Sequence, residues 1–292
     1  MQKKFKILLL ILILIIVLGF VFLFCLKNSL ADSEKILEVD FLDIGQGDSI
    51  LIKTTNDQNI LIDGGSDRTV IKRLSEELRW WDKTIDLMIL THPHDDHVGG
   101  LNDVISHYKV KKILYTGVVH NAPAYINWLN LIKDNNIPLI IISHLQTINL
   151  SEDCKLEIIY PFNDLSGKEV DNLNNSSIIA KLVYKNTSFL FTGDAEIEQE
   201  QELLKSNIDL SADVLKVCHH GANTSSPEDF LKAVNPKIAV IQVGKDNKFN
   251  HPSRRVIKRM ERMGIEIFRN DLEGTVRLFS DGDSIYCTSP QT

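Results

Sequence analysis

The chain has 292 residues, of which 43% are hydrophobic, 24% charged and 7% aromatic. This balance excludes a disordered, collagen-like or multi-span membrane protein and is typical of a globular chain. Lys and Arg number 32 against 39 Asp and Glu, so the formal net charge is −7. No overall positive field therefore attracts nucleic acid, and any nucleic-acid role must rest on a local site.

The N-terminal 31 residues differ from the rest in charge and hydropathy. They contain four lysines and no acidic residue, which leaves 28 basic and 39 acidic residues, a formal charge of −11, on residues 32–292. Between Lys6 and Lys27 runs an apolar stretch of 20 residues, 7–26, which as a helix reaches about 30 Å and matches a bilayer core. This predicts one membrane anchor with residues 32–292 outside the cytoplasm, because basic residues before a span hold the N-terminus inside. The alternative is a signal peptide cleaved near Ala31, which would make the protein secreted.

Hydrophobic periodicity predicts an α/β domain after a polar linker at 28–34. Strands are expected at 36–43, 48–53 and 58–63, followed by helices at 68–80, 98–107 and 123–135 that alternate with strands at 85–90, 111–115 and 138–142. A second strand-rich block is expected at 155–160, 177–184 and 188–192, with Asn186-Thr187 as the hairpin turn. Helices at 195–206, 227–234 and 253–263 then alternate with strands at 212–217, 237–242, 265–268, 275–279 and 284–287. Two mixed sheets packed face to face, with helices outside, satisfy this order in one domain.

The most informative segment places His-x-His-x-Asp-His directly after an apolar strand. Pro93 cannot continue a strand ladder and keeps its neighbours out of a helix, so His92 and His94 are expected to project to the same side. Asp96 and His97 follow at the predicted helix start. Two imidazoles and a carboxylate–imidazole pair in this spacing can serve two adjacent metal positions, as a two-metal hydrolase requires. A polar loop with accidental histidines is the weaker explanation, because the composition rarely produces this pattern.

This signature resembles that of the metallo-β-lactamase superfamily, with Asp63 at the family's earlier acidic position. Further motifs are similar to those of the extracytoplasmic hydrolase domain of the ComEC family of competence DNA-import proteins. They are Phe41–Ser49, Asn172–Ser177, Phe191–Asp194, Lys216–Gly221 and Asn247–Pro252. The resemblance covers about 36–280 and implies a four-layer αββα sandwich with the active site at one edge.

The resemblance also implies two divalent ions, zinc or manganese, and no organic cofactor. The first two histidines of the motif would bind one ion, and the carboxylate and histidine that follow would bind the other. Asp194 ends an apolar strand and would bridge both ions, although it could also cap a helix that begins at Ala195. Either His219 or His220 would complete the second site, and spacing does not decide between them. The candidate metal ligands are His92, His94, Asp96, His97, Asp194, His219 and His220.

Two departures from the family pattern bear on the metal. Many members supply another histidine where this chain has Asn174 and Asn175, so the first site is richer in oxygen and shifts toward harder ions such as Mn²⁺. Ala222 stands where a serine usually follows His-His-Gly. Asp63 is expected to orient a ligand histidine. The residues expected to support the ligands or contact substrate are Asp43, Gln46, Asp48, Asp63, Asn174, Asn175, Ser177 and Asn247.

Outside the metal motifs, His251 and the helix that follows it are candidates for substrate contact. A pKa near 6.5 suits His251 for proton donation or phosphate binding, with a capping or surface role as the alternative. Three other histidines match no motif and are expected to be structural or surface residues: His107, His120 and His144. One face of the helix at 253–263 is cationic. Such a face is often merely solvated, but beside a metal site in an acidic domain it suits a phosphodiester backbone. Its basic residues are Arg254, Arg255, Lys258, Arg259 and Arg262.

These observations predict a membrane-anchored, extracytoplasmic, metal-dependent hydrolase. The favoured reaction is phosphodiester cleavage, with DNA as substrate, by a hydroxide formed from a water that two ions share. In that hypothesis Asp96, Asp194 and His251 are the catalytic residues. The metal motifs do not distinguish phosphorus from carbon, so a hydrolase of carboxylic ester, lactone or lactam bonds, or a phosphocholine-type esterase, is the alternative. A non-catalytic DNA-uptake accessory is a third hypothesis. The oligomeric state is not predicted.

Overall fold

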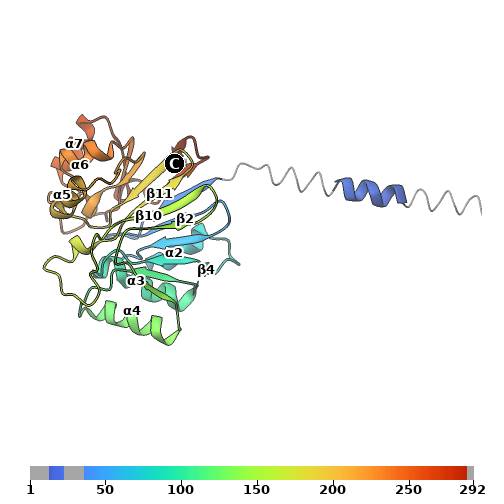
Figure 1. The fold of residues 1–292 in the computed structure, drawn as a ribbon, viewed down its shortest axis with the longest axis horizontal. Helices are drawn as coiled ribbons and strands as arrows, with labels where there is room; N and C mark the ends of the chain where they lie inside the picture. Colours follow the sequence, from blue (N-terminus) through green and yellow to red (C-terminus); the bar gives the residue numbers. More distant parts are fainter. Residues whose placement is uncertain (1–12, 23–35, 288–292) are drawn as a thin grey trace, which may run out of the picture. The chain divides into compact units, whose positions relative to one another are not determined.

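The computed structural model describes residues 13–22 and 36–287 and divides the chain into two units, 1–35 and 36–292 (Figure 1). Residues 13–22 are helical. The remainder of the predicted anchor at 7–26 lies outside the described residues. None of the helices in the described ranges is both long and apolar enough to cross a membrane.

Residues 36–287 form two large mixed sheets. The first contains β17 (Ile285–Cys287), β16 (Val276–Ser280), β1 (Leu37–Phe41), β2 (Ile50–Lys53), β3 (Asn59–Ile62), β5 (Leu87–Ile89), β7 (Ile113–Tyr115) and β8 (Leu139–Ile141), in that order. The second contains β15 (Glu266–Arg269), β14 (Ile238–Ile241), β13 (Val214–Lys216), β12 (Thr187–Phe191), β11 (Ile179–Tyr184), β10 (Cys154–Tyr160) and β9 (Gln146–Asn149). A two-stranded sheet pairs β4 (Thr84–Ile85) with β6 (Lys109–Val110).

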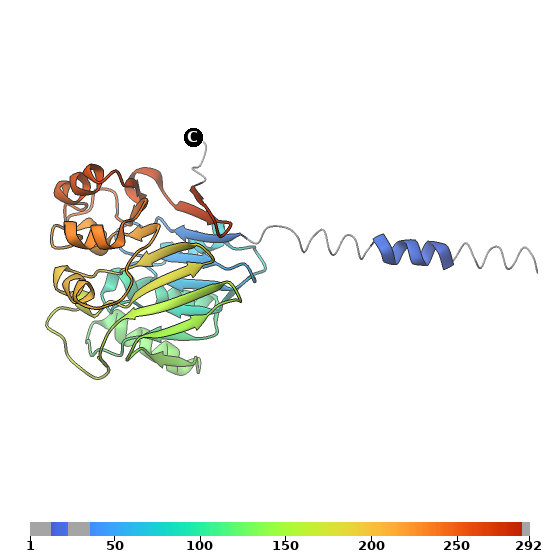
Figure 2. The same ribbon diagram turned by 45° about the horizontal axis from the view of Figure 1, so that its top comes forward.

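Helices cover the outer face of each large sheet (Figures 1 and 2). The first sheet carries α2 (Thr69–Glu77), α3 (Asp95–His107) and α4 (Pro123–Asp134). The second carries α5 (Ile197–Lys205), α6 (Glu228–Val234) and α7 (Arg254–Arg262). Short helices occur at α8 (Asn270–Glu273), η1 (Asn174–Ser176) and η2 (Cys218–Gly221). The predicted four-layer αββα arrangement of the domain is confirmed.

Alternating strand side chains fill three hydrophobic cores. One lies between the two sheets, and one lies beneath the helices of each sheet. In β2, Ile50 and Ile52 point into the core between the sheets, whereas Leu51 packs beneath the helices of the first sheet. In β12, Phe191 enters the central core and Leu190 faces α5 to α7. Because successive strand residues point to opposite faces, a strand covered on both sides reads as a continuous apolar run. This is the pattern that the sequence displays.

Some predicted boundaries and roles are wrong. The hairpin turn consists of Lys185 and Asn186, since Thr187 already pairs with Tyr184 in the ladder. Helix α5 begins at Ile197 with Glu196 as its N-cap residue, so Asp194 does not cap it. Strand β9 and the β4–β6 pair were not predicted. Strand β9 is polar, half-exposed and at a sheet edge, where hydrophobic periodicity is weakest.

Candidate metal centre

The metal motifs meet at one end of the sheets, where the loops after β1, β3, β5, β12 and β13 converge. A cavity of about 190 Å³ lies there. Gly47 brings the loop after β1 against the start of α3, because a Cβ atom on it would lie 2.1 Å from the carbonyl oxygen of Asp96. The cavity is lined by Gln46, His94, Asp96, Asn174, Asp194, His219, His220, Phe249 and His251.

Four predicted ligands form one compact cluster: Asp96, His97, Asp194 and His220. Asp194 Oδ2 lies 3.2 Å from His97 Nε2 and 3.3 Å from His220 Nε2. Asp96 Oδ2 lies 3.4 Å from His220 Nε2. Two ligand atoms on one tetrahedral zinc ion, each about 2.0–2.1 Å from it, are separated by about 3.4 Å. The spacing of the cluster therefore fits a shared cation.

Unsatisfied polar atoms in the cluster also fit a cation. The Nε2 atoms of His97 and His220 and the Oδ1 atom of Asp194 are buried and have no hydrogen-bond partner among the described residues. Buried polar atoms are normally hydrogen-bonded, so each exception needs an explanation. A metal ion that accepts these lone pairs supplies one.

The carboxylates of the cluster raise the pKa of its two histidines. Burial lowers the pKa of His97, but the carboxylates of Asp194, Asp63 and Asp96 outweigh this effect and hold the pKa well above its usual value. Burial also lowers the pKa of His220, but the carboxylates of Asp194 and Asp48 raise it by more. The pKa of His220 therefore lies well above its usual value. The carboxylates thus favour positive charge at the two imidazoles.

Hydrogen bonds hold the two imidazoles in one orientation. His97 Nδ1 lies 2.8 Å from Asp63 Oδ2, and Thr91 donates to both oxygens of the same carboxylate. His220 Nδ1 lies 2.8 Å from the Gln242 carbonyl oxygen. An imidazole whose Nδ1–H donates to an oxygen presents the lone pair of Nε2. The predicted position of Asp63 behind a candidate ligand agrees with this geometry.

His92 and His94 lie together beside the cluster. His92 Nε2 is 3.0 Å from His94 Nδ1, and the ring centroids of His92 and His97 are 4.1 Å apart. Ser177 connects this pair to the cluster, because its hydroxyl contacts His92 Nδ1 and accepts from the Asp194 backbone N–H. The structure thus brings both halves of the histidine motif into one site.

Asn174 occupies the place where a further histidine is missing. It lines the cavity, and its Oδ1 atom is buried without a hydrogen-bond partner in the described part of the chain. Asn175 points elsewhere, with its amide bound to Glu198 and its Oδ1 atom accepting from the Glu196 backbone N–H. Of the two asparagines, Asn174 is therefore the one that offers an oxygen to the site.

The geometry separates the two adjacent histidines. His220 is buried in the cluster, whereas His219 contacts the carboxylate of Glu196 at 2.9 Å and has its Nε2 atom 3.8 Å from Asp194 Oδ2. Both have positive φ, 44° for His219 and 53° for His220. This backbone is uncommon for residues other than glycine and marks a locally constrained turn.

A buried lysine next to the cluster was not predicted as a site residue. Lys216 is fully buried, pairs with Asp48, donates to the Gly193 carbonyl oxygen at 2.8 Å and lies 3.6 Å from Asp194 Oδ1. Asp48 also lies 3.3 Å from His220 Nδ1. The available signal was a single charged residue in an otherwise apolar strand, since charged residues are almost never fully buried unless paired.

Three residues expected to support the site lie around it in different ways. Asp43 pairs with Arg73 at 2.9 Å and does not line the cavity. Gln46 lines the cavity and accepts from the Gly244 backbone N–H. Asn247 is turned into its own loop, where it bonds the backbone of Gly244, Phe249 and His251.

His251 and His120 border the site. The His251 ring centroid lies 5.5 Å from that of His219. Burial, followed by the nearby His219 and His220, lowers the pKa of His251 to about 4, so the ring is neutral at pH 7. This does not favour the predicted role as proton donor. His120, predicted as structural or surface, is half-buried, lies 6.4 Å from His94 between ring centroids and helps to line a neighbouring cavity. His107 and His144 are exposed.

The cationic face of α7 has the predicted composition. Arg254, Arg255, Lys258 and Arg262 are exposed, whereas Arg259 is half-buried and donates to the Ser226 carbonyl oxygen. The helix begins three residues after His251, with Ser253 accepting from the Arg255 backbone N–H as its N-cap. Four of the five predicted cations are thus exposed at the surface.

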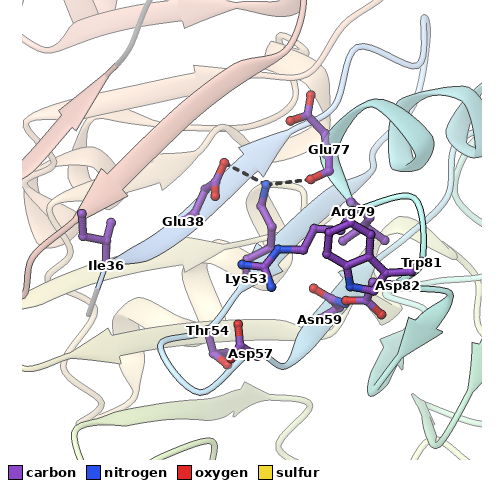
Figure 3. Close-up of a pocket in the computed structure, with 11 residues that line it drawn as sticks. Ile36, Glu38, Lys53, Thr54, Asp57, Asn59, Glu77, Arg79, Trp81 and Asp82 are labelled. Carbon is purple, nitrogen blue, oxygen red and sulfur yellow. Dashed lines mark hydrogen bonds and ion pairs between the residues drawn. The ribbon is translucent and has the colours of Figure 1, made fainter. Parts of the chain in front are cut away.

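A second cavity of about 440 Å³ lies at the opposite end of β1 to β3 (Figure 3). Glu38 and Glu77 line it, and together with the buried Asp40 they form a compact acidic group. Lys53 contacts Glu38 at 2.8 Å and Asp40 at 3.0 Å, and Arg277 donates to Glu77 at 2.9 Å. Two cationic side chains already pair with the three carboxylates, so this group is a salt-bridge network and not the metal centre.

One buried acid behind η2 gives a prediction for stability. Burial raises the pKa of Glu200 from 4.5 to about 7, although hydrogen bonds from Cys218 and the Ser226 backbone N–H oppose the change. The protonated form therefore stabilises the fold fully below pH 4.5, and this contribution is lost as pH rises through 7. Glu200→Gln keeps an acceptor for Ser226 and removes the titration. We expect the free energy of unfolding of the variant, minus that of the unsubstituted chain, to rise by about 2–3 kcal/mol between pH 5 and 8.5. Urea denaturation of both proteins at each pH measures this difference. A constant difference would contradict the prediction.

Comparisons with known proteins agree with this geometry. Residues 42–245 match the metallo-beta-lactamase superfamily. ComE operon protein 3 of Bacillus subtilis is 28% identical over 260 residues, which is 82% of this chain and 32% of that protein. Competence protein ComA of Neisseria gonorrhoeae is 29% identical over 242 residues, 80% of this chain and 31% of that protein. The chain thus spans about a third of the length of these relatives. The predicted likeness to competence proteins is confirmed.

Solved structures share the fold. The metallo-beta-lactamase fold protein YhfI from Bacillus subtilis superposes with a TM-score of 0.50 at 12% identity, covering 80% of this chain and 95% of that protein. CmlA, a diiron beta-hydroxylase from Streptomyces venezuelae, superposes with a TM-score of 0.51 at 14% identity, covering 84% of this chain and 54% of that protein. These likenesses show the fold, and the match of residues 42–245 establishes that the chain belongs to the metallo-beta-lactamase superfamily.

Proposed function

We propose that this chain is an extracytoplasmic, metal-dependent phosphodiesterase that cleaves DNA and is anchored in the cell membrane through residues 7–26. The observation that carries the hydrolytic activity is the cluster of Asp96, His97, Asp194 and His220. In it the buried Nε2 atoms of the two histidines and the Oδ1 atom of Asp194 have no hydrogen-bond partner among the described residues. The resemblance of the sequence motifs to the ComEC family of competence DNA-import proteins supports nucleic acid as the substrate. The apolar stretch supports the anchor.

The residues divide into two candidate metal sites. His92 and His94 would hold a first divalent ion, with Asn174 as an added oxygen ligand. Asp96, His97 and His220 would hold a second, and Asp194 would contribute to both. Zinc or manganese ions supply Lewis acidity, lower the pKa of a water and neutralise charge on a phosphoryl group.

The protein's own groups would prepare these ions and the substrate. Asp63 and the Gln242 carbonyl accept the Nδ1 protons of His97 and His220, which keeps both Nε2 lone pairs aimed at the site. His251, at the cavity wall, would contact the phosphodiester or its leaving group. The exposed cations of α7 would hold the flanking phosphates, since the rest of the domain repels them.

The direct test assays the full chain in detergent micelles with Mn²⁺ or Zn²⁺. We expect cleavage of single-stranded DNA and of bis(p-nitrophenyl) phosphate, and none of nitrocefin. Hydrolysis of nitrocefin or carboxylic esters without DNA cleavage would replace the proposal with carbonyl chemistry. Salt-sensitive DNA binding without cleavage under any metal condition would instead indicate a non-catalytic accessory to DNA uptake.

A further inference from the structure

The loop before α7 displays an aromatic ring at the wall of the metal cavity. Phe249 has 54% of its surface exposed and lines the same cavity as Asp96, Asp194 and His220. It belongs to none of the three hydrophobic cores formed by the described residues. An exposed ring adds little to folding, since apolar groups stabilise a fold in proportion to the area removed from water. Its position is better explained by contact with a ligand.

The ring is held in place. Its plane lies 17° from that of the His251 ring, with 5.9 Å between the centroids, so the two rings are stacked. Asn247 fixes the loop, because its Oδ1 atom accepts from the backbone N–H groups of Phe249 and His251 and its amide donates to the His251 carbonyl at 2.7 Å. A fixed ring loses little conformational freedom when a flat ligand binds to it.

We propose that Phe249, backed by His251, is a stacking platform for one unpaired nucleobase next to the phosphodiester that is cleaved. This inference rests on the proposed function and specifies its substrate as single-stranded nucleic acid. In a duplex the bases are stacked inside and a ring can reach them only after a base is flipped out. A cavity of about 190 Å³ admits a phosphate with part of one nucleotide.

Exposed cations follow the platform closely along the chain. Arg254, Arg255 and Lys258 are exposed on the helix that begins five residues after Phe249. Aromatic rings combined with a cationic track are the usual means of binding single strands without sequence preference, because every base has a π-face. The platform therefore selects strand state and not base identity.

The test compares two labelled oligonucleotides, dT12 and a 12-residue strand of tetrahydrofuran abasic sites. The full chain in nanodiscs with Ca²⁺ is titrated and the dissociation constant is read from fluorescence anisotropy. Phe249→Ala should weaken dT12 binding by roughly ten- to a hundredfold and leave binding of the abasic strand unchanged. Phe249→Tyr should retain affinity, and Phe249→Leu, which keeps an apolar side chain without a π-face, should lose it. Trp81→Ala, an exposed aromatic residue beside the opposite cavity (Figure 3), is the matched control and should have no effect.

A spectroscopic experiment detects stacking directly. Phe249→Trp is placed in a chain that also carries Trp80→Phe and Trp81→Phe, so that the buried Trp128 is the remaining native tryptophan. We expect dT12, and not the abasic strand, to quench the fluorescence of the new tryptophan. Equal losses of dT12 and abasic affinity in Phe249→Ala, full affinity in Phe249→Leu, or no dT12 binding by the unsubstituted chain would overturn the platform. DNA cleavage that persists alongside such a result would leave the proposed function standing, whereas base-dependent binding without cleavage would remove only the hydrolytic proposal.

Discussion

Asp194→Asn is expected to lower metal-dependent hydrolysis of bis(p-nitrophenyl) phosphate by about a thousandfold or more. Asp194 Oδ2 lies within 3.3 Å of both His97 Nε2 and His220 Nε2, so this oxygen is at the centre of the candidate ligand cluster. An amide cannot replace its negative charge, and Lewis-acid stabilisation by a well-held ion is worth several kcal/mol, each 1.4 kcal/mol being tenfold in rate. We expect kcat/KM and the metal content per chain to fall together.

The matched control is Asp134→Asn, which removes the same charge from an exposed position on α4. It should leave both kcat/KM and metal content unchanged. Circular dichroism of both variants checks that the fold is intact. A folded Asp194→Asn protein that keeps near-normal activity and full metal content would rule out the proposed centre.

Lys216→Met is expected to lower the free energy of unfolding by about 3–5 kcal/mol. The lysine is fully buried and pairs with Asp48, whose side chain is 2% exposed. Removing one partner of a buried ion pair leaves the other charge in a medium that solvates it poorly, which costs this amount in other proteins. Urea denaturation in EDTA measures the effect on the protein alone, because any contribution from bound metal is then absent.

Two comparisons isolate the buried charge. Asp48→Asn combined with Lys216→Met removes both charges and should recover part of the loss, since no unpaired ion remains. Lys237→Met breaks an exposed pair in which the lysine is 82% exposed, and its effect should stay within about 0.5 kcal/mol. If Lys216→Met were no more destabilising than Lys237→Met, the buried pair would not be the support that we describe.

Local patterns carried most of the predicted architecture. Strands such as β2 are apolar on both faces and recognisable from their own residues, and the histidine motif is contiguous, so His92, His94, Asp96 and His97 could be proposed without knowing the fold. Asp194 was recognisable because it follows the apolar strand β12, which ends three residues earlier at Phe191. Its supposed capping role failed because α5 starts later, at Ile197.

Contacts between distant segments could not be predicted in the same way. Asp48 lies in the loop between β1 and β2 of the first sheet and Lys216 in β13 of the second, and the two give no joint signal in the sequence. The choice between His219 and His220 depends on a turn in which both residues have positive φ. Histidine seldom adopts this conformation, so the sequence does not predict it. His120 reaches the rim of the site through the loop after β7, and no motif surrounds it.

The direction of β1 has a practical consequence. The described domain begins at Ile36, which borders the salt-bridge cavity, and β1 then runs five residues toward the loop that carries Gln46 at the metal centre. A strand of this length spans about 17 Å, so any attachment ahead of Ile36, whether a bead, a fluorescent fusion or a lipid-bound segment, meets the domain at the end remote from the reactive pocket. A fusion made directly at Ile36 should therefore leave substrate entry open. The same geometry would allow this unit to be appended to a larger polypeptide without obstructing its chemistry.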